Sequence, residues 1–268
     1  MLGISIRANW DFEKVINLII DLNIDLCEIQ LDNTIFKFQE DRKKTIKLIN
    51  KLYSSDLQLS FHLSFIDLNI ASLDNKIRYY TSKLLRKEIM FVKKWNPFYI
   101  VVHTGKISNT FYEVPSVKEK AHKQQIKTIS ELIKISNIYS IPFAIENRQK
   151  SSTSGLIQNI NDIQYYNQLF PTLQYVLDIG HLNTFYTDPN ALLEEIKVIG
   201  DFPLIAIHLS NNFGKDTHGS LEDGTIPIKS LFSKVPSLKE KCLIIENKLF
   251  KNTLESLDFL YNLIIGKA

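Results

Sequence analysis

The feature of this 268-residue sequence that most constrains its fold is a regular alternation of short apolar runs with longer, helix-like segments. Strand followed by helix through the whole chain predicts parallel strands, because a parallel pair needs a crossover of this size. The apolar runs, which we expect to form eight strands, are Leu2–Ser5, Leu26–Gln30, Leu57–Phe61, Phe98–Val102, Pro142–Ile145, Leu173–Leu177, Leu204–Ile207 and Cys242–Ile245.

Segments between these runs predict helices. Phe12–Leu22, Lys76–Lys94 and Ser116–Ser136 have apolar residues at helical spacing. Asp188-Pro189 fits an N-cap followed by proline at the first helical position, and the small polar cluster Ser151–Gly155 is expected to be a loop. Eight strand–helix units in this length predict one α/β domain over residues 1–268, a (β/α)8 (TIM) barrel, with an open doubly wound sheet as the alternative.

The composition is that of a globular protein with a sizeable core, because 44% of the residues are hydrophobic and 23% are charged. The formal net charge of +3 neither indicates nor excludes a nucleic-acid partner. Cys27 and Cys242 lie far apart in apolar contexts, as expected of buried thiols in a reducing compartment.

Targeting and cofactor motifs are missing from the sequence. Polar residues follow the first strand at once, unlike a signal peptide, and no apolar run approaches a membrane span. No Gly-rich phosphate loop follows the first strand. We therefore expect a cytoplasmic protein with no membrane partner and no obligate protein partner.

Residues that can bind metal ions gather where the predicted strands end. In a barrel these ends converge on one rim. Carboxylates alone there would repel one another, whereas divalent cations remove that conflict, and carboxylate with imidazole suits zinc, manganese or iron. Any one of these residues is explained as simply by an N-cap or a hydrogen bond, but all nine together predict a metal site. They are His62, His103, Glu146, Asp178, His181, His208, Asp216, His218 and Glu246.

His122 is the one histidine inside a helical segment, and we expect it to be exposed and structural.

These motifs resemble the xylose-isomerase-like barrels, a superfamily that includes endonuclease IV and sugar-phosphate isomerases and epimerases. The resemblance runs from the first predicted strand to the eighth. It rests on His62-Leu-Ser-Phe65, Val102-His103-Thr-Gly105, Ile145-Glu146-Asn147, Asp178-Ile-Gly-His181, His208-Leu-Ser-Asn211, Asp216-Thr-His218 and Ile245-Glu246-Asn247.

Two metal-binding patterns in that superfamily compete. The isomerase pattern implies one metal on Glu146, Asp178, His208 and Glu246. The endonuclease IV pattern implies up to three metals. It adds His62 and His103 for one metal, bridged by Glu146, and His181, Asp216 and His218 for another. The Asp-x-His pair is the most telling, since single-metal relatives usually lack it.

The resemblance therefore implies an endonuclease IV-like, metal-dependent phosphodiesterase that acts on abasic DNA or a related phosphodiester. Zinc is the expected metal, with manganese or iron as alternatives, and Glu146 and Glu246 are the expected catalytic residues. The alternative is a sugar or sugar-phosphate isomerase or epimerase in which the same two glutamates act as acid and base. The expected partner is thus a phosphodiester, with DNA included, or a sugar phosphate.

Expected substrate-binding residues lie close to these ligands in sequence. Some of them mark departures from endonuclease IV. Arg148-Gln149 replaces a glycine, Phe65 replaces a tyrosine, and residues 30–37 hold one basic and one acidic residue where the repair enzyme has a polar, basic loop. The full set is Phe65, Asn211, Arg148, Lys215 and Lys248.

Overall fold

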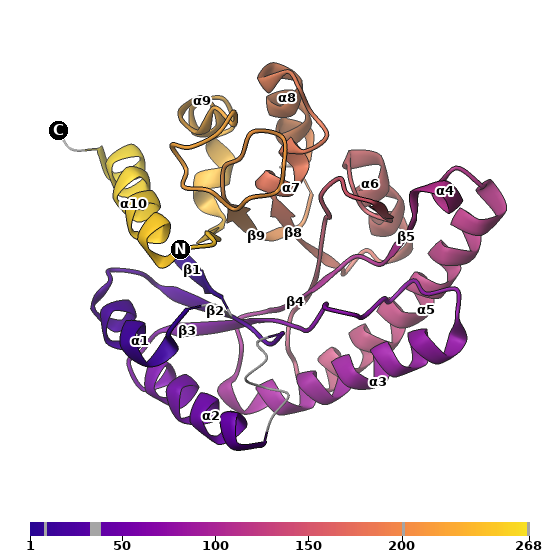
Figure 1. Ribbon diagram of the computed structural model, residues 1–268, viewed down its shortest axis with the longest axis horizontal. Coiled ribbons are helices and arrows are strands. Elements are labelled where there is room, and N and C mark those ends of the chain that lie inside the picture. Colours follow the sequence, from indigo (N-terminus) through magenta and orange to yellow (C-terminus); the bar gives the residue numbers. More distant parts are fainter. Residues whose placement is uncertain (8–9, 33–38, 200–201, 267–268) are drawn as a thin grey trace.

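A computed structural model describes residues 1–7, 10–32, 39–199 and 202–266. Eight parallel strands close into a barrel in the order β1-β10-β9-β8-β6-β4-β3-β2. Helices form a ring around the strands (Figure 1), which confirms the predicted (β/α)8 barrel. The barrel strands are β1 Leu2–Ile6, β2 Leu26–Gln30, β3 Gln58–His62, β4 Ile100–His103, β6 Phe143–Glu146, β8 Gln174–Asp178, β9 Leu204–Leu209 and β10 Cys242–Ile245.

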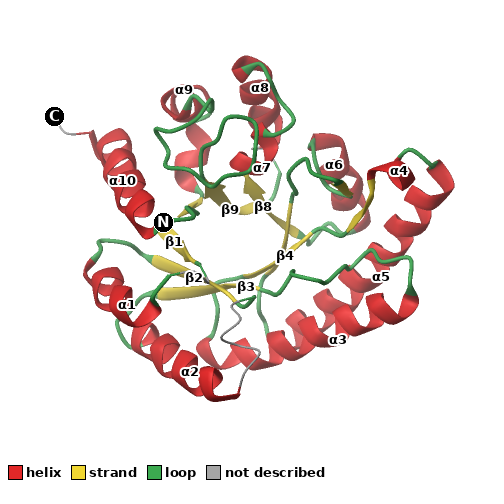
Figure 2. Ribbon diagram, in the orientation of Figure 1, coloured by secondary structure: helices red, strands yellow, loops and turns green. Residues whose placement is uncertain are grey.

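Helices alternate with the barrel strands along the chain, as Figure 2 shows. The three predicted helices form close to their expected bounds, and Asp188 caps α8 by accepting a hydrogen bond from the Asn190 N–H at 3.0 Å. The α-helices are α1 Phe12–Asp21, α2 Gln39–Tyr53, α3 Asn75–Val92, α4 Asn109–Tyr112, α5 Pro115–Ile138, α6 Ile160–Leu169, α7 Ile179–Asn183, α8 Pro189–Ile199, α9 Ile228–Lys234 and α10 Phe250–Tyr261. Short 3-10 turns follow α3 and α9, and a π turn, Asn262–Gly266, follows α10.

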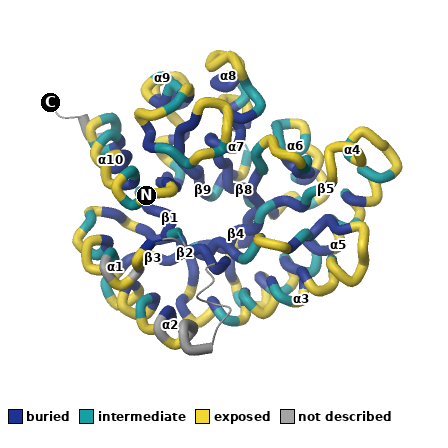
Figure 3. Tube along the Cα trace, in the orientation of Figure 1, coloured by how far each residue is buried: buried dark blue, intermediate teal, exposed yellow. Residues whose placement is uncertain are grey.

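The core has two layers because successive side chains of a strand point to opposite faces. The larger layer lies between the strands and the helices, and the strands are the buried centre of Figure 3. A smaller apolar cluster, which we call the inner plug, shares the opposite strand face and fills the barrel. It consists of Leu26, Tyr99, Val101, Ala144, Val176, Ala206, Cys242 and Ile244.

One predicted loop is wrong. Thr153–Gly155 forms β7, which pairs antiparallel with β5, Lys106–Ser108, in a two-stranded ribbon outside the barrel. The sequence did not reveal this strand because its three small polar residues have no apolar periodicity.

Both cysteines are buried and unpaired, as expected. Among the described helices, none has the length and apolarity needed to cross a membrane. Most of the segment 30–37 falls on residues 33–38, which lie outside the described residues.

Candidate metal centre

The metal-binding candidates on the barrel strands form the last inward-facing layer of side chains, directly above the inner plug. Val101 of the plug is two residues before His103, and Ala206 is two residues before His208, so each pair shares one strand face. The same spacing applies to Glu146, Asp178 and Glu246, each two residues after a plug residue. Regular strand geometry therefore brings residues from distant parts of the sequence to one mouth.

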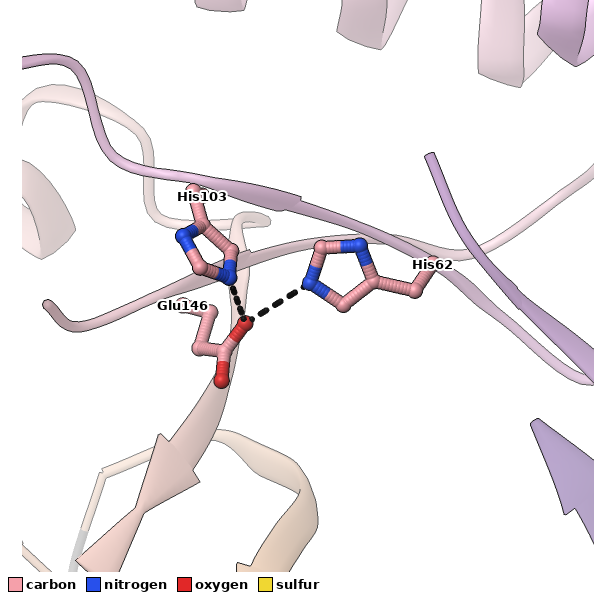
Figure 4. Close-up of side chains that lie close together, drawn as sticks. All are labelled: His62, His103 and Glu146. Carbon is pink, nitrogen blue, oxygen red and sulfur yellow. Dashed lines mark hydrogen bonds and ion pairs between the residues drawn. The ribbon is translucent and has the colours of Figure 1, made fainter. Parts of the chain in front are cut away.

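The first ligand set joins β3, β4 and β6. Nε2 of His62 and Nε2 of His103 each lie 3.0 Å from Glu146 Oε2, and both rings point at that oxygen (Figure 4). Nδ1 of His62 lies 2.9 Å from the Leu63 carbonyl, so an Nδ1–H donor there leaves Nε2 free to bind a metal. The Phe65 ring stacks flat on His103, with 4.3 Å between ring centroids.

A second set uses the other oxygen of Glu146. Nδ1 of His208 lies 3.1 Å from Glu146 Oε1 and 2.9 Å from Glu246 Oε2. Asp178 completes this set, and all four residues are buried. Glu146 thus presents one oxygen to each of two sets.

The turn after β8 holds Asp178 and His181 in place. Asp178 caps α7 by accepting a hydrogen bond from the His181 N–H at 2.7 Å. Gly180 allows a close approach here, because a Cβ at this position would overlap Ser210 Oγ and lie 3.1 Å from Asp178 Oδ1. The Asn147 side chain binds the Asp178 backbone at both N–H and carbonyl.

The third set lies in the loops beyond the strands. Asp216 lies 3.6 Å from His181 Nε2 and 3.2 Å from His218 Nε2. The Nδ1 atoms of both histidines lie within hydrogen-bond distance of backbone carbonyls. The distance is 2.9 Å from His181 Nδ1 to Asn147 O and 3.1 Å from His218 Nδ1 to Glu246 O. His218 adopts a left-handed backbone with φ 49°, a conformation that costs a non-glycine residue about 1–3 kcal/mol.

Glu28 is a buried residue of the centre that the sequence analysis missed. Its Oε2 lies 3.2 Å from His208 Nε2 and accepts a hydrogen bond from the Tyr99 hydroxyl at 2.7 Å. A carboxylate behind a metal-binding histidine fixes the ring and makes its other nitrogen more basic. The available signal was an acidic residue inside the predicted strand Leu26–Gln30.

Two further residues that the sequence analysis missed fix Glu246. Its Oε1 accepts hydrogen bonds from Gln30 Nε2 at 2.7 Å and from Arg7 Nη1 at 3.3 Å. Its Oε2 faces His208. The two oxygens of Glu246 therefore have separate partners, one outside the cluster and one within it.

In this layer of buried ligand side chains, carboxylates face imidazoles, and the two kinds of group shift each other's pKa values. Burial would raise the pKa of Glu146, but His103 and His208 bring it well below its usual range. Burial would lower the pKa of His62, yet the hydrogen bond and charge of Glu146 raise it to about 9. Burial dominates at His103 and lowers its pKa to about 3.

Similar opposing effects act at the third set. Burial works against the charged form of His181, and the carboxylates of Asp178, Asp216 and Glu146 raise its pKa to about 10. Burial raises the pKa of Asp178 to about 6, with Glu146 and Glu246 adding to the effect and His181 opposing it. Divalent cations would take the place of these protons, because metal binding requires neutral imidazole and ionised carboxylate.

Divalent cations fit the three ligand sets. Within each set one donor atom per residue lies within 4.8 Å of the others. The buried oxygen Asp178 Oδ2, a candidate ligand atom of the second set, has no hydrogen-bond partner among the described residues. Neutral nitrogen with carboxylate oxygen is the donor set of zinc, manganese and iron sites. The structure thus brings all nine predicted ligands together.

The predicted substrate-binding residues divide into two groups. Phe65 and Lys248 line a cavity beside the third set, and Arg148 lines a much smaller one with His103. The structure does not bring Asn211 to these cavities, because its amide holds the following loop through Leu221 O at 2.9 Å and Ile226 O at 3.1 Å. Lys215 is exposed.

His122 differs slightly from expectation. It lies on α5, away from the metal centre, and is half-buried rather than exposed. Its ring packs against Tyr165 and Tyr166, and its Nδ1 lies 2.7 Å from the Tyr166 hydroxyl.

Comparison with known proteins supports the fold. The family model described as xylose isomerase-like TIM barrel matches residues 16–263. "Uncharacterized protein MJ1311" of Methanocaldococcus jannaschii is 26% identical over 246 residues, covering 89% of this chain and 80% of that protein.

Two solved structures represent the two enzyme classes. A D-tagatose 3-epimerase-like protein superposes with a TM-score of 0.82 at 22% identity, covering 98% of this chain and 97% of that one. Endonuclease IV from Thermus thermophilus superposes with a TM-score of 0.70 at 15% identity, covering 98% of each chain. At such identities these likenesses establish the barrel and not the reaction.

Proposed function

The chain belongs to the xylose isomerase-like TIM barrel family, and we propose that it is a metal-dependent phosphoester hydrolase with a trinuclear site. Its substrate in this proposal is abasic DNA or a related phosphodiester. The observation that carries the proposal is the position of Asp216 and His218, which face His181 and add a third ligand set to the two around Glu146.

Glu146 is the central residue of the proposed site. It presents Oε2 to His62 and His103 and Oε1 to His208, so its two oxygens would bridge two ions. Divalent cations bound to these sets would place positive charge next to the phosphate oxygens and would lower the pKa of a bound water molecule to near neutral. A site of this kind suits phosphodiester hydrolysis, because the charge that develops on the phosphate is spread over several oxygens.

Glu246 is arranged as a fixed anion. Arg7 and Gln30 bind its Oε1. Although burial would raise its pKa, His208 and His218 hold it well below its usual range. A carboxylate that stays ionised serves as a metal ligand, whereas a proton shuttle needs a pKa near the working pH. Glu246 is therefore arranged as a metal ligand, a role that it has in both candidate functions.

The second candidate function is a metal-dependent isomerase or epimerase of sugars or sugar phosphates. One observation favours it: the buried set of Glu146, Asp178, His208 and Glu246 is complete without the other five ligands. In this case the two glutamates would ligate one metal and move protons between neighbouring sugar carbons.

Metal content provides the first test. Protein loaded with zinc and dialysed should retain three ions per chain, one for each ligand set. Asp216→Ala and His218→Ala should each lose one ion and keep the fold, as judged by circular dichroism. One ion per chain in the wild-type protein, with the third set empty, would support the isomerase.

Hydrolysis provides the second test. The zinc-loaded protein should cleave a duplex that contains an abasic site, or hydrolyse bis(4-nitrophenyl) phosphate. Asp216→Ala should abolish this activity, and Glu146→Gln should be at least as damaging because Glu146 contacts two sets. Asp258→Ala, at an exposed position on α10, is the matched control. Fully loaded protein that cleaves no phosphodiester but epimerises a ketose would refute the hydrolase.

A further inference from the structure

A cavity of about 470 Å³ opens beside the third ligand set. This volume lies within the range of about 300–1,000 Å³ that is usual for small-molecule sites. Its residues come from the ends of β1, β2, β3 and β10 and from the loop that carries the third set. They are Arg7, Gln30, Asp32, Phe65, Ile66, Asp216, Thr217, His218 and Lys248.

One side of the cavity is cationic. Arg7 follows β1, and its guanidinium lies 3.3 Å from Glu246, with 20% of the side chain exposed. Lys248 follows β10, and its backbone is held at both ends. Its N–H donates to His218 O at 3.0 Å, and its carbonyl accepts from Trp10 Nε1 at 3.2 Å. These contacts hold Arg7 and the backbone of Lys248 next to the third ligand set.

The segment after β3 makes another side of the cavity apolar. Ile66 is 48% exposed although it is a large aliphatic residue, and Phe65 lies beside it with its ring stacked on His103. The Asp32 carboxylate accepts hydrogen bonds from the N–H groups of both residues, the one from Ile66 at 3.1 Å. Asp32 thus fixes the segment that presents the two apolar side chains.

We propose that this cavity binds the substrate as a compact phosphoester in which an apolar or aromatic group is attached to the phosphate. The inference rests on the proposed function and narrows its substrate. The anionic group would lie between the third set and the cations Arg7 and Lys248, and the apolar group would pack on Phe65 and Ile66. A polar sugar or an isolated inorganic anion would leave the apolar side uncovered.

The proposal can be tested by binding, without turnover. Phenylphosphonate and methylphosphonate carry the same anion, differ in the apolar group and contain no hydrolysable ester. Calorimetric titration of the zinc-loaded protein should give a dissociation constant about tenfold lower for phenylphosphonate, because the phenyl group buries more apolar surface.

Two variants assign the effect to the two sides of the cavity. Ile66→Ser should remove most of the preference for phenylphosphonate, whereas Ile77→Ser, equally exposed at 48% but on α3, should keep it. Lys248→Met should weaken both phosphonates alike, and Lys251→Met, at an exposed position on α10, should weaken neither. Zinc content is measured for each variant so that loss of metal is not mistaken for loss of contact.

The outcomes separate this inference from the proposed function. No preference for phenylphosphonate, a preference that survives in Ile66→Ser, or binding of an abasic duplex but of neither phosphonate overturns the cavity assignment. Hydrolysis in the same preparations would leave the proposed function standing. The expected binding pattern together with no phosphodiester hydrolysis would keep the cavity's ligand class and refute the hydrolase.

Discussion

Replacing Glu28 with glutamine tests whether the buried carboxylate behind His208 strengthens metal binding. The Oε2 position accepts from Tyr99 at 2.7 Å and lies 3.2 Å from His208 Nε2, so a glutamine carbonyl there keeps both contacts and removes only the charge. Oε1 accepts no hydrogen bond from the described residues, so placing the glutamine amide nitrogen at this position breaks no existing hydrogen bond.

The expected loss of zinc affinity at the second ligand set is about 10–100-fold, the usual effect of losing a partner of a ligating histidine. This corresponds to about 1.4–2.7 kcal/mol. A second effect opposes it. Burial lowers the pKa of His208, but Glu28, Glu146 and Glu246 together raise it well above its usual value. Removing Glu28 eases the competition from protons, so the loss should be largest at alkaline pH and smaller near neutral pH.

Zinc affinity is measured by competition with a chromophoric chelator at several pH values between 7 and 9. Glu131→Gln is the control, because it makes the same change of carboxylate to amide at a residue of α5 that pairs with Arg78 of α3 at 3.3 Å and is not among the candidate ligands. An unchanged affinity at pH 9, or a loss that grows as the pH falls, would refute the assigned role of Glu28.

Three further predictions concern stability. The metal-free protein should lose stability as the pH rises from about 6.5 to about 10, because His62 and His181, with pKa values of about 9 and about 10, keep protons in the folded state that they lose near pH 6.5 in the unfolded chain; urea denaturation in chelator would show it, and stability that rises over this range would contradict it. Gly180→Ala should cost about 1–3 kcal/mol through overlap with Ser210 Oγ, and Gly180→Ala/Ser210→Ala should recover part of that cost in the same assay; purely additive losses would be inconsistent with the contact. Burial raises the pKa of Glu88 to about 7, so its ionisation destabilises the fold as the pH rises from about 4.5 through 7; Glu88→Gln should flatten thermal stability over that interval, and an unaltered pH profile would disprove the assignment.

One physical reason explains why the barrel, and the inward-facing candidate ligands at its strand ends, could be predicted from the sequence. A strand places alternate side chains on the same face, so a residue such as Glu146, two positions after the inward-facing Ala144, must also face the lumen. Buried parallel strands read as apolar runs, and their polar ends then stand out. All eight predicted strands overlap the barrel strands for this reason.

Residues that hold a candidate metal ligand in place, and are not ligands themselves, could not be found in the same way. Glu28 and Gln30 lie within a predicted strand, but their partners His208 and Glu246 are far away in sequence and become neighbours only when the barrel closes. Arg7 looked like an ordinary polar residue after a strand for the same reason.

Asn211 shows that a residue in a recognisable motif can have a structural role instead of the predicted functional one. Its motif suggested contact with substrate, whereas the fold uses it to hold a loop.

The inner plug gives the barrel a single entrance. Within the part of the chain that the structure describes, Tyr99, Val101 and the other plug residues fill the lumen with apolar atoms directly under the ligands. In the proposed metal-dependent enzyme, ions, water and product would therefore share this route. The metal ions would then have to bind before the substrate, because a bound substrate would cover them.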